Sequence, residues 1–534
     1  MTKRNWWLPG SLSLFAILLL TTGPIAALLL QSREHDLGAL LNDSYLVHII
    51  WFSFYQALLS TLLSLLLAIP LAQALSRRRF IGRTLLLRLF GLSLVLPVIL
   101  VVFGIVTVHG RQGWVNQLLQ AVGLESVGYL YGLAGILLAH IFFNMPLAAR
   151  ILLQAIESIP ASQWRIANQL GFNGWQLFLR LEWPVMRSAL PALASMIFML
   201  CFTSFATVMA LGGGPKSTTL EVAIYQAIRF DFDLPYAGML ALLQLLFCAS
   251  FLLLQYRFTS RSTAIQLSNL GLIARPDRQQ LSLRLWDTLV LILCLALFLP
   301  PLLAIISSGL NPKLIAALSS AQLWHATRTS LLIASGAALL SMLFTVSLLI
   351  TSRHLRLQLQ RRRSAALMEA IGSIILVLPA VVLSTGLFIM LRNVADVFTL
   401  GPILVLLVNA LMALPYGLRA LQAPMERVSR QHHKLCESLG INGWARIKQV
   451  EWPLLRKSMA LTFALAMMLS LGDLSAIALF GSQSLQTLPW LLYQQLGNYQ
   501  LTEASATALV LLMLSLGLFM LIEGVLGGKD AATN

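Results

Sequence analysis

The sequence predicts an all-α, polytopic membrane protein with about twelve transmembrane helices in two tandem halves of six. The 534 residues are 58% hydrophobic and 11% charged, whereas a soluble domain usually carries about 25% charged residues. A bilayer core takes about 20 apolar residues per helix, and roughly twelve apolar runs of that length fit along the chain. Several landmark residues also recur at one fixed offset, which indicates an internal duplication.

The apolar runs fall into two groups of six. The predicted spans of the first group are 11–30, 48–72, 84–108, 128–155, 187–211 and 235–256. Those of the second group are 285–308, 328–351, 366–391, 402–421, 457–481 and 504–524. We expect a first transmembrane half at 1–256, a polar cytoplasmic linker at 257–284 and a second half at 285–534. The first run is expected to be an uncleaved helix, because it is long for a signal peptide and lacks a clean cleavage site.

The basic residues set the predicted orientation. Lys3 and Arg4 precede the first span, and further clusters lie at 77–83, 257–284 and 353–363. Lys and Arg collect in cytoplasmic loops, and all four clusters share one side if the N-terminus is cytoplasmic. Both termini are therefore predicted to be cytoplasmic. The net charge of +17 needs no nucleic-acid partner, since the arginines sit in short loops beside apolar runs.

The two halves match in detail as well as in the number of spans. Five pairs of residues stand 269 positions apart: Pro146 and Pro415, Arg150 and Arg419, Gly171 and Gly440, Pro184 and Pro453, Arg187 and Arg456. Because each half has an even number of spans, the second half enters the membrane in the same direction as the first. The halves are therefore predicted to be parallel repeats about an axis along the membrane normal.

One polar loop occurs twice, as "LGFNGWQLFLRLEWP" at 170–184 and "LGINGWARIKQVEWP" at 439–453. Gly171 can take the left-handed conformation that closes a helix, and Asn173-Gly174 is a turn signal. A second short helix is expected from Trp175 to Trp183, before Pro184 ends it or starts the next element. The second copy is expected to follow the same plan. Each copy is then a compact cytoplasmic helix–turn–helix, either a docking surface for a partner or a brace for the bundle.

These loops resemble the EAA loop of binding-protein-dependent ABC importer permeases. That pattern is Glu-Ala-Ala, a Gly four residues after the last Ala, and a Pro thirteen residues after the Gly. The glycines and prolines of both copies match, as does Ala167 for the second Ala. Arg165 and Lys434 stand at the Glu position, Ile166 and Leu435 at the first Ala, and Cys436 at the second Ala. The resemblance therefore does not imply the family's Glu-based contact to the ATPase for this chain. It does imply that the loop is a docking element.

The resemblance implies two fused permease halves in a bacterial inner membrane, working by alternating access. A periplasmic solute-binding protein would deliver the solute, and two copies of a cytoplasmic ABC ATPase would dock on the loops. ATP and Mg would be used by that ATPase, so this chain is expected to bind no cofactor and to be no enzyme. The expected docking residues are Arg165, Ala167, Gly171, Asn173, Gly174, Glu182, Pro184, Lys434, Cys436, Gly440, Asn442, Gly443, Glu451 and Pro453.

Residues 201–233 are similar to the corresponding stretch of importer permeases for thiamine and thiamine pyrophosphate. Thiamine and its phosphates are therefore the expected solutes. The alternatives are a ferric iron or other small-solute importer, a secondary transporter, and a membrane scaffold without transport. The paired loops argue against the last two.

Asp473 falls inside the predicted span 457–481, where a charge is costly and usually faces a cavity or a partner. Its counterpart at the same offset is Ser204, next to Phe205. One hypothesis is that Asp473, Ser204 and Phe205 line the translocation path. The alternative is a carboxylate satisfied by a neighbouring helix.

Other motifs predict no further chemistry. "GGGPKSTT" at 212–219 lacks the Gly that a phosphate-binding P-loop places directly before its Lys. The four cysteines have no CxxC spacing, so neither a disulfide nor a metal site is expected. No nucleophile–base arrangement is apparent, and no catalytic residue is predicted.

Overall fold

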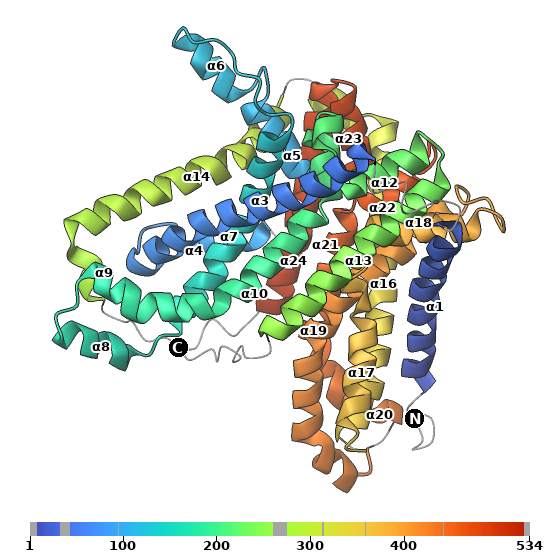
Figure 1. Ribbon diagram of the computed structural model, residues 1–534. Coiled ribbons are helices and arrows are strands. Elements are labelled where there is room, and N and C mark those ends of the chain that lie inside the picture. Colours follow the sequence, from blue (N-terminus) through green and yellow to red (C-terminus); the bar gives the residue numbers. More distant parts are fainter. Residues whose placement is uncertain are drawn as a thin grey trace.

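The computed structural model describes residues 8–32, 43–93, 96–259, 275–311, 314–357, 359–441 and 443–527. In these ranges the regular structure is helical throughout (Figure 1). Eleven of the described helices are long and apolar enough to cross a membrane, and the shorter apolar helix Ala380–Leu391 takes the place of the ninth predicted span. The all-α class with about twelve spans in two halves is thereby confirmed.

The helices of the predicted first half run from α1 to α13. Its helices are α1 (Leu8–Gln31), α3 (Ser44–Arg77), α4 (Arg83–Leu92), α5 (Val98–His109), α6 (Trp114–Ala121), α7 (Leu133–Glu157), α8 (Ala161–Gln169), α9 (Gly174–Leu177), α10 (Trp183–Phe202), α11 (Phe205–Leu211), α12 (Leu220–Arg229) and α13 (Leu234–Thr259). A π-helical turn, Phe178–Glu182, joins α9 to α10, and a 3-10 turn, Pro215–Ser217, precedes α12.

The second half follows a 3-10 turn at Pro276–Gln279. Its helices are α14 (Leu281–Gly309), α15 (Leu314–Leu318), α16 (Ala321–Leu357), α17 (Arg362–Gly372), α18 (Ala380–Leu391), α19 (Gly401–Ser438), α20 (Gly443–Arg446), α21 (Trp452–Leu471), α22 (Ser475–Phe480), α23 (Leu488–Gly497) and α24 (Leu501–Gly527). A 3-10 turn, Ile374–Leu376, precedes α18, and a π-helical turn, Ile447–Glu451, joins α20 to α21.

Four predicted spans are not single helices. Span 84–108 is divided into α4 and α5, with Pro97 as the N-cap of α5. Span 366–391 is divided into α17 and α18, with Pro379 as the N-cap of α18. Proline has no N–H to donate and disfavours a helical preceding residue, which explains both breaks. Spans 187–211 and 457–481 are likewise interrupted, between α10 and α11 and between α21 and α22.

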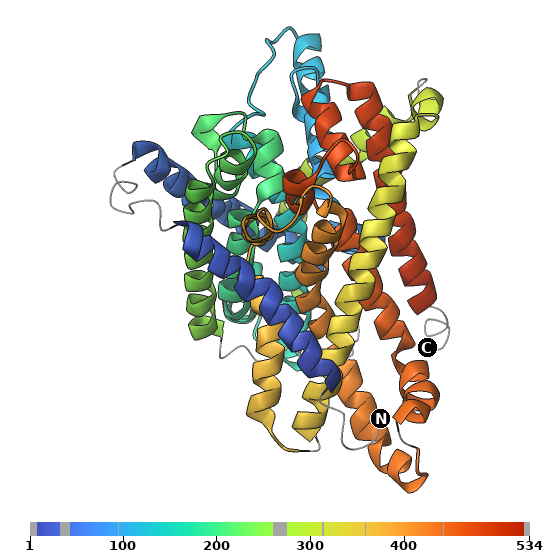
Figure 2. The ribbon, with the colours of Figure 1, turned by 90° about the vertical axis from the view of Figure 1, so that its right-hand side faces the viewer.

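The first helix of each half packs on the other half. α1 lies against α16 and α18, and α14 lies against α3 and α5. Figure 1 shows α14 and α1 at opposite sides of the molecule, and Figure 2 shows the start of α1 meeting the lower end of α16. The approach of α14 to α5 is close, since a Cβ on Gly104 would stand 2.4 Å from the carbonyl oxygen of Pro301. The two halves are thus held together by exchanged helices.

The duplication is also visible in a repeated buried hydrogen bond. In the first half, the backbone N–H of Leu220, at the start of α12, donates to the hydroxyl of Ser53 on α3 (3.0 Å). In the second half, the N–H of Leu488, at the start of α23, donates to the hydroxyl of Ser330 on α16 (2.7 Å). Each bond supplies an acceptor for an N–H group at a helix N-terminus, where the N–H has no acceptor within its own helix.

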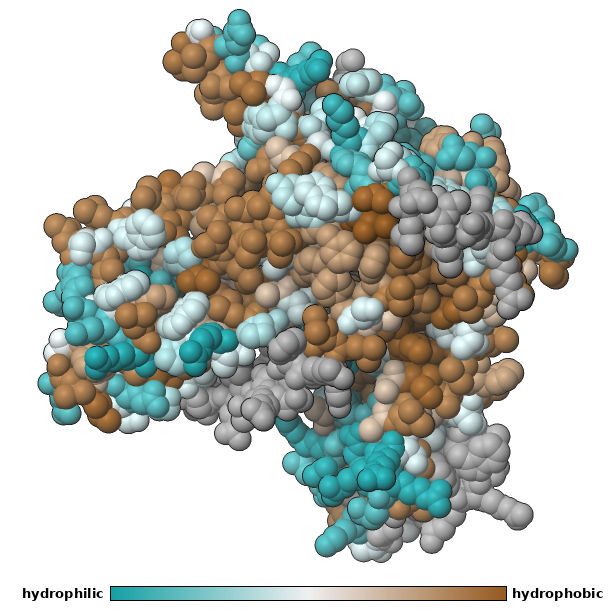
Figure 3. All heavy atoms as spheres, in the orientation of Figure 1, coloured by the Kyte–Doolittle hydropathy of each residue, from teal (hydrophilic) through white to brown (hydrophobic). Residues whose placement is uncertain are grey.

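The surface is consistent with a membrane protein. Figure 3 shows hydrophobic side chains across the middle of one face, and hydrophilic side chains at the top and around the ends of the two lower limbs. A folded soluble monomer rarely exposes a contiguous apolar surface larger than a few hundred Å².

The contact between α5 and α14 gives a test of the exchanged-helix packing. Gly104→Ala should destabilise the detergent-solubilised protein by about 1–3 kcal/mol, because the added methyl group overpacks a backbone contact. Gly517→Ala on α24 is the matched control, because a Cβ there meets nothing within 4 Å. Thermal unfolding followed by tryptophan fluorescence compares them. Equal melting temperatures for the two variants would contradict the packing described.

Candidate functional site

The first copy of the repeated loop is a helix, a tight turn and a second helical segment. Pro160 is the N-cap of α8. Gly171 closes α8 with a φ of +66°, and the N–H of Phe172 donates to the carbonyl of Ala167 (3.0 Å), as in a Schellman motif. Asn173 then caps α9, because its side chain accepts from the N–H of Gln176 (2.9 Å) while its own N–H donates to the Gln176 side chain (3.0 Å). The predicted left-handed conformation of Gly171 is confirmed, whereas Asn173-Gly174 begins a helix instead of forming a turn.

The segment after the turn differs from the prediction. α9, the π-helical turn and α10 follow one another without a break, so 175–183 is no separate short helix. Pro184 is the second residue of α10, directly after the π-helical turn, so its missing N–H removes one backbone hydrogen bond from this continuous helical run.

The second copy is built differently at its start. α19 continues to Ser438, whereas α7 ends at Glu157 and α8 begins anew. The residue that corresponds to Pro160 is Ser429, which does not interrupt a helix. Gly440 closes α19 with a φ of +64°, and Ile441 N–H donates to the Cys436 carbonyl (2.8 Å). Asn442 lies outside the described residues, and Gly443 begins α20.

The two loops lie at the ends of two separate limbs. In Figure 1, α8 and α9 are at the lower left, and the end of α19 with α20 is at the bottom. Ala167 and Cys436 are buried, whereas Arg165 and Lys434 are exposed.

Each loop also exposes two large apolar side chains one helical turn apart. Ile166 and Leu170 are 55% and 65% exposed in the first loop, and Leu435 and Leu439 are 55% and 62% exposed in the second. We call these the apolar pairs. Leu170 and Leu439 were not among the sequence candidates, although their i, i+4 spacing in both copies was a usable signal.

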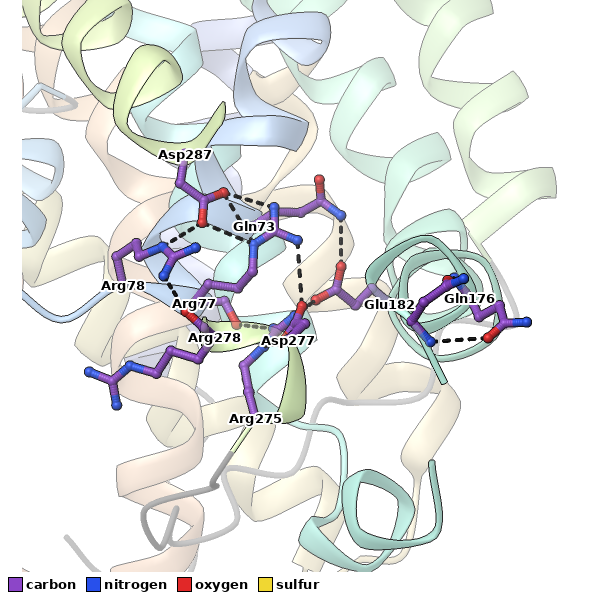
Figure 4. A network of polar contacts seen from close by, with 11 residues as sticks. Gln73, Arg77, Arg78, Gln176, Glu182, Arg275, Asp277, Arg278 and Asp287 are labelled. Carbon is purple, nitrogen blue, oxygen red and sulfur yellow. Dashed lines mark hydrogen bonds and ion pairs between the residues drawn. The ribbon is translucent and has the colours of Figure 1, made fainter. Parts of the chain in front are cut away.

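Glu182 is fully buried beside α3 and the segment before α14 (Figure 4). Gln73 donates to its Oε2 (2.7 Å), and Arg275 Nη2 donates to its Oε1 (2.5 Å). Arg275 also donates to Asp277 Oδ2 (2.9 Å), and its guanidinium carbon lies 4.4 Å from the centre of the Trp164 ring on α8. One arginine therefore fixes both ends of the first loop to the segment that enters the second half.

A second buried group of charges fixes α14 to α3. Asp287 on α14 accepts from Arg77 Nη2 (2.9 Å) and Arg78 Nε (2.6 Å), and Arg77 Nη1 stands 3.7 Å from Asp277. Burial alone would raise the pKa of Asp277, but the hydrogen bond and charge of Arg275 hold that pKa below its usual value. The carboxylate therefore stays ionised at neutral pH.

The second loop is tied down within its own half. Glu451 Oε1 accepts from Arg353 Nη2 (3.0 Å) and Arg446 Nε (3.0 Å). Nearby, Arg356 pairs with Glu369 (2.6 Å) and with Glu426. Because Glu182 and Glu451 are both buried in these contacts, neither carboxylate faces outward from its loop.

The three path candidates have different surroundings among the described residues. Asp473 lies in the break between α21 and α22, where its carboxylate accepts from the N–H groups of Ser475 and Ala476 (3.1 Å each). The carboxylate therefore caps the start of α22. Phe205 is buried with its ring 5.5 Å from that of Tyr225, and Ser204 is the N-cap of α11. None of the three candidates lines the cavity of about 1070 Å³ between the halves.

Comparison with known proteins identifies the family. The model of the "Binding-protein-dependent transport system inner membrane component" family matches residues 60–263 and 355–523. The chain is 46% identical over 530 residues to the thiamine transport system permease protein ThiP of Escherichia coli (strain K12), covering 99% of this chain and 98% of that protein.

Proteins with the same name from two other bacteria are also similar. The identity is 42% over 513 residues for Haemophilus influenzae, with 95% of this chain and 94% of that protein covered. It is 41% over 525 residues for Brucella abortus (strain 2308), with 98% and 96% covered. This chain therefore belongs to the family of binding-protein-dependent transport system inner membrane components, which are multi-pass permeases that work with a binding protein and an ATPase.

Proposed function

We propose that this chain is the permease subunit of an ATP-driven importer that carries thiamine and its phosphates into the cytoplasm. The observation that carries the proposal is the 46% identity over nearly the whole length of a thiamine transport permease. A protein of Haemophilus influenzae named for ferric transport is only 25% identical over 460 residues. Thiamine is therefore favoured over iron as the solute.

Two copies of the ATPase subunit are proposed to dock on the two loops, one on each. Both loops present the same surface, in which an apolar pair follows an exposed basic residue, Arg165 or Lys434. An apolar pair needs a hydrophobic recess on its partner, and the basic residue suits an acidic rim. The buried residues of the loops, such as Ala167, Glu182 and Glu451, would hold this surface in place without touching the ATPase.

The loops and both termini are proposed to face the cytoplasm, with the halves divided at 1–256, 257–284 and 285–534. Arg275, at the described end of the proposed linker, pairs with Glu182 of the first loop, which supports a common side for the linker and the loop. Four further arginines form ion pairs near the loops, namely Arg77, Arg78, Arg353 and Arg356. This concentration of arginines at one end supports a cytoplasmic orientation for that end.

The buried ion pairs connect each loop directly to a membrane helix, and through them a movement of the loop would reach that helix. Closure of the ATPase dimer on ATP would displace α8 and the π-helical turn. Arg275 bonds the π-helical turn and stacks on Trp164 of α8, so it would carry that displacement to the start of α14. In the second half, Arg353 would carry it from Glu451 to α16.

The docking surface can be tested with a double substitution in the first loop. Ile166→Asp with Leu170→Asp should weaken binding of the ATPase to that loop by about 100-fold or more, because two apolar contacts of about 1.5–3 kcal/mol each are lost. Co-purification of the tagged permease with its ATPase measures the effect, and Leu435→Asp with Leu439→Asp should act alike on the second loop.

Leu124→Asp is the matched control, because Leu124 is 57% exposed on the connection between α6 and α7, away from both loops. Full recovery of two ATPase copies with the double variants would rule out the proposed surface.

The solute can be tested by uptake. Cells that lack their own thiamine permease should accumulate radiolabelled thiamine when this chain is expressed with its ATPase and binding protein, and should not accumulate ferric iron through it. Uptake of iron but not of thiamine would make the iron importer the correct assignment.

A further inference from the structure

A cavity of about 1070 Å³ lies between the two halves, at the end of the molecule opposite the loops. The first half contributes residues of α5 and α11, and the second half contributes the end of α14, α23 and the start of α24. Figure 1 shows α5 and α23 side by side at the top, far from α8 and α20. The volume is at the upper end of the range of small-molecule sites.

The lining combines three tyrosines with one arginine. Tyr131, Tyr493 and Tyr499 line the cavity, and Arg111 is the one charged residue among the lining residues described. Burial raises the pKa of Tyr131, Tyr499 raises it further, and the charge of Arg111 lowers it. Tyr499 and Arg111 therefore stand close enough to Tyr131 to influence it.

Tyr499 is held in an unusual backbone conformation. Its φ is +57°, in the left-handed region that glycine adopts freely and that costs other residues on the order of 1–2 kcal/mol. Its side chain is 85% exposed, so packing offsets little of that cost. The conformation closes α23, because the N–H of Gln500 donates to the carbonyl of Gln495 (2.9 Å) as in a Schellman motif, and Tyr499 lines the cavity at this point.

The first half has a counterpart that lies outside the cavity. Phe232 follows α12 as Tyr499 follows α23, with a φ of +56° and an exposure of 78%. It does not line the cavity. Tyr499 and Phe232 share the left-handed backbone conformation, but only Tyr499 lines the cavity. A comparison of the two residues therefore distinguishes an effect of the backbone conformation from an effect of lining the cavity.

We propose that this cavity binds a solute in which an aromatic cation is joined to a phosphate, with the tyrosine rings facing the cation and Arg111 facing the phosphate. Aromatic rings attract cations through their faces, and arginine matches phosphate with paired, charge-assisted hydrogen bonds. No acidic residue is among the lining residues described, so the proposal assigns the cation to the tyrosine rings. The inference rests on the proposed function and makes Arg111 the residue that distinguishes thiamine phosphates from thiamine.

The test compares uptake of thiamine monophosphate with uptake of thiamine, in proteoliposomes that hold the permease with its ATPase and are supplied with the binding protein. Arg111→Gln should lower the ratio of phosphate-ester uptake to thiamine uptake about tenfold, the loss expected for a hydrogen bond to a charged group. Arg328→Gln is the matched control, because Arg328 is exposed near the start of α16 and does not line the cavity. An unchanged ratio for Arg111→Gln would overturn the proposal.

A second pair of variants tests the tyrosines. Tyr499→Gly and Phe232→Gly should both leave the melting temperature unchanged or higher, because each relieves a left-handed residue. Only Tyr499→Gly should reduce uptake of both solutes. An equal loss of uptake in the two variants, or no loss of uptake in either, would contradict a role for the cavity in solute binding. Failure of the wild-type complex to transport thiamine would refute the proposed function itself, which separates the two outcomes.

Discussion

Buried carboxylates that must each meet an arginine are the constraint on which the arrangement of this molecule depends. Glu182, Asp277 and Asp287 have almost no exposure, and transferring such charges out of water costs several kcal/mol each unless they are paired. Their partners come from α3 and from the segment before α14, as Figure 4 shows. Satisfying all three carboxylates at once therefore fixes the first loop, α3 and α14 relative to one another.

The exchange of first helices extends this constraint to the whole chain. α14 belongs to the second half in sequence but packs on α3 and α5 of the first, and α1 packs on α16 and α18 of the second. A helix of 29 residues such as α14 is roughly 40 Å long. Its start is held by the ion pairs beside the first loop, and its end contributes Ser308 to the cavity. The proposed docking loop and the proposed solute site are thus joined by one continuous helix.

The sequence allowed the class of fold and the local form of the loops to be predicted, because these depend on composition and on single residues. Gly171 and Gly440 both adopt the left-handed conformation that their place after a helix suggested. The second loop differs from the first because Ser429 stands where the first copy has Pro160. The glycines that both copies share gave no sign of this local difference. The sequence left the role of Asp473 open, because a capping carboxylate and a path-lining carboxylate look alike until the break between α21 and α22 is known.

Other features depend on contacts between distant residues and could not be predicted. Glu182 and Arg275 are 93 residues apart, and Arg77 and Asp287 are 210 residues apart, so no spacing rule connects them. The apolar pairs were visible as a pattern, but only the exposure of their side chains distinguishes them from buried helix positions. The cavity is formed by helices of both halves, and therefore no single stretch of the chain indicates it.

The central proposal is that two loops of one chain receive two ATPase subunits. Native mass spectrometry of the complex purified in mild detergent with ATP and its binding protein measures this directly. One permease chain with two ATPase subunits is the predicted composition. A complex with one ATPase subunit, or none, would contradict it.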